Sequence, residues 1–491
     1  MTTAVENDKK YNRAKLWQIG LFALNNAATN LYMFILLFVS YYAAGVAGLT
    51  VAIVSSILMF MRIFDGITDP IVGFIIDKTE SKFGKFRPMM ILGNSLLATS
   101  IILMYSITHN LPAQYQLIFF ILTYALYVIG YTLQTAVTKA AQTVLTNDPK
   151  QRPLFAVFDG IYVTVIFTLG QVYVASYLMG KYGDFTIGLF TELNTLAIIV
   201  AATCTILAVI GISGKDRKEF YGLADLNVNT RFRDYWPILK GNKPLQLLVT
   251  AVTVDKLAFS LLRQSVVIVM VFGILMGNYA LSGTISLITT VPTLLIVFAA
   301  VAVARKKGMR KSFIIATWIA FLSLAGLFAL FLIVDPSTMS SGVSVGLVAF
   351  VILYTLAIGF GQIPSTLVNP MIADVSDYET YKSGRYVPGM LGTLFSFVDK
   401  LITSLAPAII GLGVALIGFN NAFPTVNDPL TTPLFWMTLA LAFGLPALML
   451  IISITCMKFY KLDDKRMEEI QTELARLKEE GKIEDSEIEA I

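Results

Sequence analysis

The sequence predicts an all-helical integral membrane protein with twelve transmembrane helices, arranged as two six-helix bundles that repeat one another. Three observations support this fold class. The 491 residues are 56% hydrophobic and only 14% charged, whereas charged residues make up about a quarter of a soluble domain. Apolar segments of about 20 residues or more recur along the chain, each long enough at ~1.5 Å per residue to cross ~30 Å of hydrocarbon. A polar stretch divides these segments into two sets of six.

The expected helices follow one another at short intervals. They span residues 17–44, 50–76, 88–107, 115–145, 153–180, 188–213, 244–276, 280–304, 312–333, 345–372, 388–418 and 434–458. Transmembrane strands are excluded, because the segments are too long and lack alternating polarity. The first segment is also too long for the core of a signal peptide, so it is expected to remain as a helix.

This arrangement predicts five parts of the chain. They are an N-terminal segment (1–16), an N-terminal six-helix bundle (17–213), a central loop (214–243), a C-terminal six-helix bundle (244–458) and a tail (459–491). The two halves resemble each other in their loops, since "DKTESKFGKFRP" follows the second helix and "ARKKGMRKSF" follows the eighth. A weak repeat of this kind is typical of transporters in which two bundles rock about a central site.

The charges of the loops predict the orientation in the membrane. The loops of one side contain a single basic residue, Lys181, and the loops of the other side contain many. The basic set comprises Lys78, Lys82, Lys85, Arg87, Lys150, Arg152, Arg305, Lys306, Lys307, Arg310, Lys311, Lys382 and Arg385. By the positive-inside rule, we expect a multi-pass protein of the plasma membrane with both termini in the cytoplasm. The net charge of +5 then follows from topology and not from nucleic-acid binding.

The charged tail is expected to contain an amphipathic helix. Met467, Ile470, Leu474 and Leu477 recur at helical spacing, which predicts a cytoplasmic helix packed on the loops. A face that binds a partner protein is the alternative.

Bound metals, disulfides and cofactors are not expected. The chain has two cysteines, Cys204 and Cys456, both in apolar segments where small buried residues are common, and one histidine, His109, in a short loop. These residues do not form the pattern of a disulfide framework, a zinc site or a haem site.

The second expected helix carries three charged residues on one face. Arg62, Asp65 and Asp69 are spaced i, i+3, i+7. A charged side chain at the centre of a bilayer costs ~2.5–3.5 kcal/mol, so these residues are expected to line the bundle interior or a water-filled cavity. Asp69 precedes Pro70, which leaves the carbonyl of Gly66 without its helical partner. Two carboxylates and a free carbonyl suit Na⁺ or a proton, and an ion pair between Arg62 and Asp65 that fixes helix packing is the alternative.

The segment "DGITDPIVGFIIDKTESKFGKFRP" resembles the signature of the glycoside–pentoside–hexuronide:cation symporter family, the melibiose-permease group of the major facilitator superfamily. The matching positions are Asp65, Asp69, Pro70, Gly73, Asp77, Thr79, Gly84, Lys85, Arg87 and Pro88. Three further segments, Met371–Tyr386, Phe395–Phe419 and Tyr460–Leu474, resemble other parts of the family pattern. The resemblance therefore spans nearly the whole chain and implies the major facilitator fold.

The resemblance implies uptake of a solute, often a sugar, coupled to Na⁺, Li⁺ or H⁺. It assigns Asp65 and Asp69 to the cation site, and Lys400 matches the family's lysine on helix eleven, which faces the same cavity. A buried lysine needs a nearby carboxylate or it loses its proton. Lys400 opposite Asp65 is therefore expected to stabilise both groups when no cation is bound.

The sequence departs from the sugar-binding members at several positions. Helix one offers Asn26 and Asn30 but no acid, helix four offers Gln134 and Lys139, and helix five offers Asp159 near the place of an arginine. The polarity of the expected substrate cavity is thus inverted, which disfavours an ordinary galactoside. A uronate, another anionic glycoside or a non-sugar solute fits better, unless Lys139 and Asp159 pair with each other.

Helices seven and ten add further candidates for the substrate cavity. Lys256 and Arg263 share a face of helix seven and can bind a carboxylate, unless Lys256 only balances Asp255 and Arg263 pairs elsewhere. Gln362 and Asn369 of helix ten are spaced i, i+7 and can offer amides to a substrate.

The loop after the second helix is expected to hold a gate closed at the cytoplasmic side. Its members are Asp77, Lys85 and Arg87, and its expected counterparts include Asp374 and Asp377 after helix ten. These residues can also serve only as positive-inside anchors and their counter-charges.

Together these features predict a secondary active transporter that couples a cation, Na⁺ or H⁺, to a sugar, glycoside or uronate. A carrier of lysolipids or other non-sugar solutes on the same fold is the alternative. A membrane-embedded transferase is a minor one, and the chain is not expected to be an enzyme because no nucleophile–base pair or donor-binding loop is present. The expected partners are a small solute, a monovalent cation and lipids, and the protein is expected to be a monomer without a cofactor.

Overall fold

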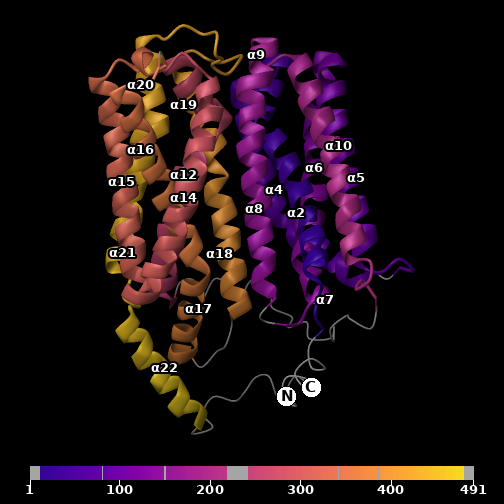
Figure 1. Cartoon of the computed structure of the whole chain (residues 1–491), viewed down its shortest axis with the longest axis vertical. Helices are drawn as coiled ribbons and strands as arrows, with labels where there is room; N and C mark the ends of the chain where they lie inside the picture. The colour runs from indigo at the N-terminus through magenta and orange to yellow at the C-terminus, as the bar shows by residue number, and fades with distance from the viewer. Residues whose placement is uncertain are drawn as a thin grey trace. The chain divides into compact units, whose positions relative to one another are not determined.

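The computed structural model of the chain describes residues 12–79, 81–148, 151–217, 241–340, 342–383 and 388–479. These ranges are helical and contain no strand. They include twelve spans that are long and apolar enough to cross a membrane, so the predicted fold class is confirmed. Figure 1 shows the long, nearly parallel helices of each part of the chain. The predicted central loop, 214–243, lies mostly outside the described residues.

The chain forms two compact units. Unit 1 comprises Met1–Asp225, Tyr279–Leu287 and Val414–Asn427, and unit 2 comprises Leu226–Asn278, Ile288–Gly413 and Asp428–Ile491. Short pieces of the eighth and eleventh spans thus cluster with unit 1. The simpler division into residues 17–213 and 244–458 stays a prediction.

Unit 1 contains the first six spans. Its helices are α2 (Leu16–Leu36), α3 (Val39–Tyr41), η1 (Tyr42–Val46), α4 (Val51–Lys78), α5 (Phe86–Ile107), η2 (Thr108–Asn110), α6 (Ala113–Ala140), α7 (Gln142–Leu145), α8 (Arg152–Val172), η3 (Tyr173–Leu178), α9 (Met179–Tyr182) and α10 (Ile187–Ile212). Helix α2 packs against α6, α8 and α10, and α6 packs against α4 and α5. Fully buried Phe22, Met90 and Val137 belong to the core of this unit, which places α6 where its polar residues meet α2, α4 and α5.

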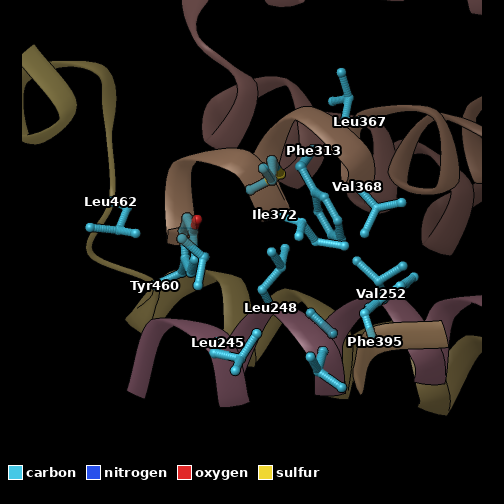
Figure 2. Packing of buried hydrophobic residues seen from close by; sticks show 14 of the residues in the cluster. Leu245, Leu248, Val252, Phe313, Leu367, Val368, Ile372, Phe395, Tyr460 and Leu462 are labelled. Carbon is cyan, nitrogen blue, oxygen red and sulfur yellow. The ribbon is translucent and has the colours of Figure 1, made fainter. Parts of the chain in front are cut away.

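Unit 2 contains most of the last six spans. Its helices are α12 (Lys243–Leu262), α13 (Ser265–Ile268), η6 (Val269–Leu275), α14 (Ala280–Lys307), α15 (Met309–Ile333), η7 (Pro336–Met339), α16 (Val345–Gly361), α17 (Ile363–Ser383), α18 (Pro388–Thr403), α19 (Leu405–Leu416), α20 (Thr432–Leu439), η8 (Ala440–Gly444), α21 (Leu445–Phe459) and α22 (Asp464–Glu479). Helix α12 packs against α17, α18 and α21. Figure 2 shows the core there, where Leu248 and Val252 of α12 lie in one cluster with Ile372 of α17 and Phe395 of α18.

Several of the predicted spans are interrupted or extended, among them the seventh and the tenth. The predicted helix 244–276 divides at Leu262, after which α13 and a π-helical turn continue it. The predicted helix 345–372 divides at Gln362, and α17 then runs on to Ser383. Pro364 suits the start of α17, because a proline lacks the N–H that the first helical turn leaves unused. The polar extension of α17 persists because its acids find partners, as described below.

The predicted amphipathic helix of the tail is present as α22. Ile470 and Leu474 are buried in the core of unit 2, and Met467 packs against them. Leu477 has no described side chain. Figure 1 shows α22 beyond the end of α17, against which it packs.

Candidate functional site

A buried carboxylate connects α4 with α6 in unit 1. Asp65 is 5% exposed, and its Oδ1 accepts a hydrogen bond of 3.0 Å from the Thr132 hydroxyl. The Thr68 hydroxyl donates to the Asp65 carbonyl at 3.0 Å, and its oxygen lies 3.1 Å from that of Thr132. We call Asp65, Thr68 and Thr132 the acid–threonine cluster. A carboxylate beside two hydroxyl oxygens offers the hard oxygen ligands that a small cation prefers.

Asp69 and Arg62 flank this cluster on α4. Asp69 is half-buried, one turn after Asp65 and on the same face. Arg62 is exposed, and no ion pair joins it to Asp65 among the residues described. The alternative in which Arg62 and Asp65 form a structural ion pair is therefore not realised here.

A second polar cluster joins α2 to α8. The Asn30 amide donates to the Asn26 carbonyl at 2.8 Å and to its side-chain oxygen at 3.2 Å. Asn26 in turn interacts with the Asp159 carboxylate, whose buried Oδ1 has no hydrogen-bond partner in the described part of the chain. We call Asn26, Asn30 and Asp159 the amide–acid cluster, because it combines amide donors with a carboxylate acceptor.

The two predicted cavity residues of α6, Gln134 and Lys139, form no hydrogen bond with the amide–acid cluster among the described residues. Gln134 is fully buried and donates from its amide to the Met90 carbonyl of α5 at 2.9 Å, so it bridges helices. Lys139 is exposed. Within the described ranges, no ion pair joins Lys139 to Asp159, which leaves the lysine available to other groups.

In unit 2, an ion pair joins α12 to α18. Lys256 Nζ lies 2.9 Å from Asp399 Oδ2, and the two side chains are 25% and 21% exposed. The ammonium also lies 5.1 Å from the centre of the Phe395 ring. Lys256 is thus bound to Asp399, whereas the alternative to a substrate-binding role was a charge balance between Lys256 and Asp255. The sequence interpretation assigned no role to Asp399.

The other predicted cavity residues of unit 2 differ in exposure. Arg263 and Asn369 are exposed, and Gln362 and Lys400 are half-buried. Gln362 ends α16 immediately before α17 begins. The expected approach of Lys400 to Asp65 spans the two units and stays a prediction.

The predicted gate loop is bound by an acid that the sequence interpretation missed. The Asp216 carboxylate, just after α10, accepts backbone hydrogen bonds of about 3 Å from Lys85, Phe86 and Arg87 at the start of α5. Arg87 also contacts it, with Nε 3.4 Å from Oδ2. Gly84 has φ +94°, and a Cβ there would lie 2.2 Å from Asp216 Oδ2. Asp216 therefore latches the gate loop to the end of α10 within unit 1; the side chain of Asp77 lies outside the described residues.

The predicted acidic counterparts on α17 face the tail helix. Asp377 Oδ2 accepts a hydrogen bond of 2.6 Å from Gln471 of α22. Asp374 lies near Asp377 and Asp464. Burial, and then the charge of Asp374, raise the pKa of the Tyr460 phenol. This end of unit 2 is thus held together by α17 and α22.

Sequence signals existed for some of the missed residues. Asp216 follows shortly after the sixth apolar span, where an acid can accept hydrogen bonds at the membrane boundary. Thr68 lies beside Asp69 on the charged helix. Thr132 gave no signal, because a threonine in an apolar helix most often bonds its own backbone. No cluster of three or more His, Cys, Asp or Glu residues suited to a metal occurs among the described residues.

Known proteins and a family model match this chain over most of its length. The family model described as "MFS/sugar transport protein" matches residues 21–464. The chain is 23% identical to the uncharacterized symporter YnaJ of Bacillus subtilis, covering 96% of both chains. It is also 23% identical to a glucuronide carrier protein homolog of Escherichia coli, covering 89% of this chain and 90% of the relative.

A solved structure supports the fold. The crystal structure of the nucleoside transporter NupG matches with a TM-score of 0.61 at 12% sequence identity, covering 91% of this chain and all of that one. At this identity the likeness shows the fold alone. The relatives are membrane transporters and not enzymes, and they favour neither the lysolipid carrier nor the transferase.

Proposed function

Because the chain belongs to the MFS/sugar transport protein family, we propose that it is a cation-coupled symporter. It moves a sugar, glycoside or uronate together with Na⁺ or H⁺ across the plasma membrane by alternating access. It works as a monomer with both termini in the cytoplasm, and it needs no cofactor beyond the coupling cation. The asymmetry of basic loops supports this orientation.

The observation that carries the proposal is the burial of Asp65 beside two hydroxyls. An acid in a transmembrane helix is costly and is kept for ion or proton pathways. Thr132 and Thr68 place hydroxyl oxygens beside Asp65, and Asp69 lies one turn away, so oxygen ligands of the kind that a small cation prefers are gathered here. Relatives named as symporters support the same role.

The solute is recognised in part by the amide–acid cluster. Sugar hydroxyls both donate and accept hydrogen bonds, so Asn26, Asn30 and Asp159 match them chemically. The buried Oδ1 of Asp159, which has no partner among the described residues, is an acceptor for such a hydroxyl. The exposed Lys139 offers a charge for a carboxylate, and one relative is named as a homolog of a glucuronide carrier.

Uptake into proteoliposomes tests the proposal. Radiolabelled glucuronate, methyl glucuronide and methyl galactoside are supplied with an imposed Na⁺ or H⁺ gradient. At least one solute is expected to accumulate only when a cation gradient is imposed. Accumulation that does not depend on any cation gradient would contradict cation-coupled transport. Asp65→Asn is expected to abolish accumulation, whereas Asp335→Asn, in an exposed turn, is expected to leave it intact.

A further inference from the structure

Unit 2 contains a buried acid, Asp255, in the second half of α12. Asp255 is 1% exposed, and neither of its carboxylate oxygens has a hydrogen-bond partner among the described residues. The positions that share its face of the helix, Val252, Ala258 and Phe259, are apolar and buried. This carboxyl is therefore enclosed by apolar groups on its own helix.

Among the described residues, no charged group of the neighbouring helices forms a hydrogen bond with the Asp255 carboxylate. On α12 itself Lys256 is the nearest charge, and it is bound to Asp399 of α18. The helices that pack against α12 also carry titratable groups. These groups are Asp374, Asp377, Glu379 and Lys382 on α17, Lys400 on α18, Cys456 and Lys458 on α21, and Tyr354 on α16. Glu379 accepts a hydrogen bond from Asn242, which precedes Asp255 by thirteen residues, or roughly 20 Å along a helix. Asp377 is bound to α22.

An ionised carboxylate in such a place is unstable. A buried charge needs an opposite charge or several hydrogen bonds, and a carboxyl that has neither takes up a proton and becomes neutral. We infer that Asp255 is a proton-binding site of unit 2, occupied by a proton in the conformation described here.

The adjacent ion pair provides the means of release. Lys256 and Asp399 are each about a quarter exposed, so their pair borders water. When the pair opens, the freed Lys256 ammonium balances a negative charge on Asp255, and the proton leaves to that water. When Lys256 returns to Asp399, the carboxyl regains its proton. The bound state is thus COOH beside a closed pair, and the released state is COO⁻ beside Lys256.

Asp255 belongs to unit 2 and is not a member of the acid–threonine cluster, which belongs to unit 1. Its test uses purified full-length protein and needs no transport. Infrared difference spectra between acidic and alkaline buffers detect the C=O stretch of a protonated carboxyl, which a carboxylate does not give. Asp255→Asn is expected to lose one such band, and Glu379→Gln, which changes another buried acid of unit 2, is expected to keep it.

Neighbouring variants test the release step. Asp399→Asn frees Lys256, so the Asp255 band is expected to vanish at a lower pH than in the unaltered protein. Lys256→Met removes the counter-charge, so the band is expected to persist to a higher pH. If Asp255→Asn does not fold, Asp255→Glu, which retains a carboxyl, is expected to move the band instead.

Two results would overturn the inference. One is a spectrum of Asp255→Asn that is identical to that of the unaltered protein at every pH. The other is a thermal stabilisation by Na⁺ at constant pH that Asp255→Asn abolishes, because it would make Asp255 an ionised ligand of a metal cation.

Discussion

The hydroxyl of Thr132 in α6 donates a hydrogen bond of 3.0 Å to the buried Asp65 carboxylate in α4. This contact ties the helix that carries the acids to a second helix of unit 1. It also provides a way to distinguish the two candidate coupling ions, because a hydroxyl has a different effect on each of them.

Thr132→Val is expected to shift the coupling-ion dependence about tenfold, because a hydrogen bond to a charged group contributes about 1.5–3 kcal/mol. With Na⁺ as the coupling ion, the concentration for half-maximal uptake rises, since a ligand oxygen is lost. With H⁺ as the coupling ion, the Na⁺ concentration has no effect in either protein, and the shift appears in the dependence of uptake on pH. Uptake assays across Na⁺ concentration and pH measure this.

Thr123→Val is the matched control for that variant. Thr123 is buried on the same helix, but among the described residues its hydroxyl bonds only the carbonyls of Phe119 and Phe120. Its removal is expected to leave both ion dependences unchanged. If both variants show the same dependence of uptake on Na⁺ concentration and pH, Thr132 does not belong to the cation site.

Asp216→Ala is expected to lower the thermal stability of the purified protein. The variant leaves three backbone N–H groups at the start of α5 without their acceptor, and the loss of a helix cap costs about 1–2 kcal/mol. Asp335→Ala also removes a cap, but from an exposed turn of four residues. It is expected to change stability by less than about 0.5 kcal/mol. An equal loss of thermal stability in Asp216→Ala and Asp335→Ala would contradict the stabilising role of Asp216.

Gly84→Ala is expected to destabilise the protein more than Gly183→Ala. Both glycines have positive φ, so a side chain costs about 1–2 kcal/mol at each. Only at Gly84 would the added Cβ also collide with the Asp216 carboxylate, since nothing lies within 4 Å of it at Gly183. Thermal unfolding of the two variants compares them, and a smaller effect at Gly84 would contradict the close approach.

A double-mutant cycle of Lys256→Met and Asp399→Asn is expected to show a coupling energy of about 1 kcal/mol in thermal stability. The pair is short and partly shielded from water, which places it above most surface pairs. The Lys181–Glu192 pair, with side chains 47% and 27% exposed, serves as the comparison and is expected to couple less strongly. A coupling energy near zero for Lys256 and Asp399 would show that their ion pair does not stabilise the protein.

Ile470→Asp is expected to detach α22 from α17, because it places a charge at a position that is 1% exposed. Hydrogen exchange of the α22 amides is expected to become faster, with little change in the transmembrane helices. Ala475→Asp, at an exposed position of the same helix, is the control and is expected to keep the slow exchange. Unchanged exchange in Ile470→Asp would argue against docking.

The sequence by itself determined the helical class, the number of crossings and the amphipathic tail helix. Those features follow from hydrophobic length and periodicity, which are local properties of the chain. The motif around Asp65 also indicated the family, because it is contiguous in sequence. The interruption after Leu262 and the extension of α17 to Ser383 were missed, since distant side chains decide whether a polar helical turn persists.

Only the tertiary structure decided which polar groups meet. Thr132 and Asp65 are 67 residues apart, Arg87 and Asp216 are 129 apart, and Lys256 and Asp399 are 143 apart. Periodicity places each residue on a face of its own helix, but it does not say which helix that face will contact. The partners of a buried charge are set by helix packing, and packing depends on side-chain shape along the whole interface.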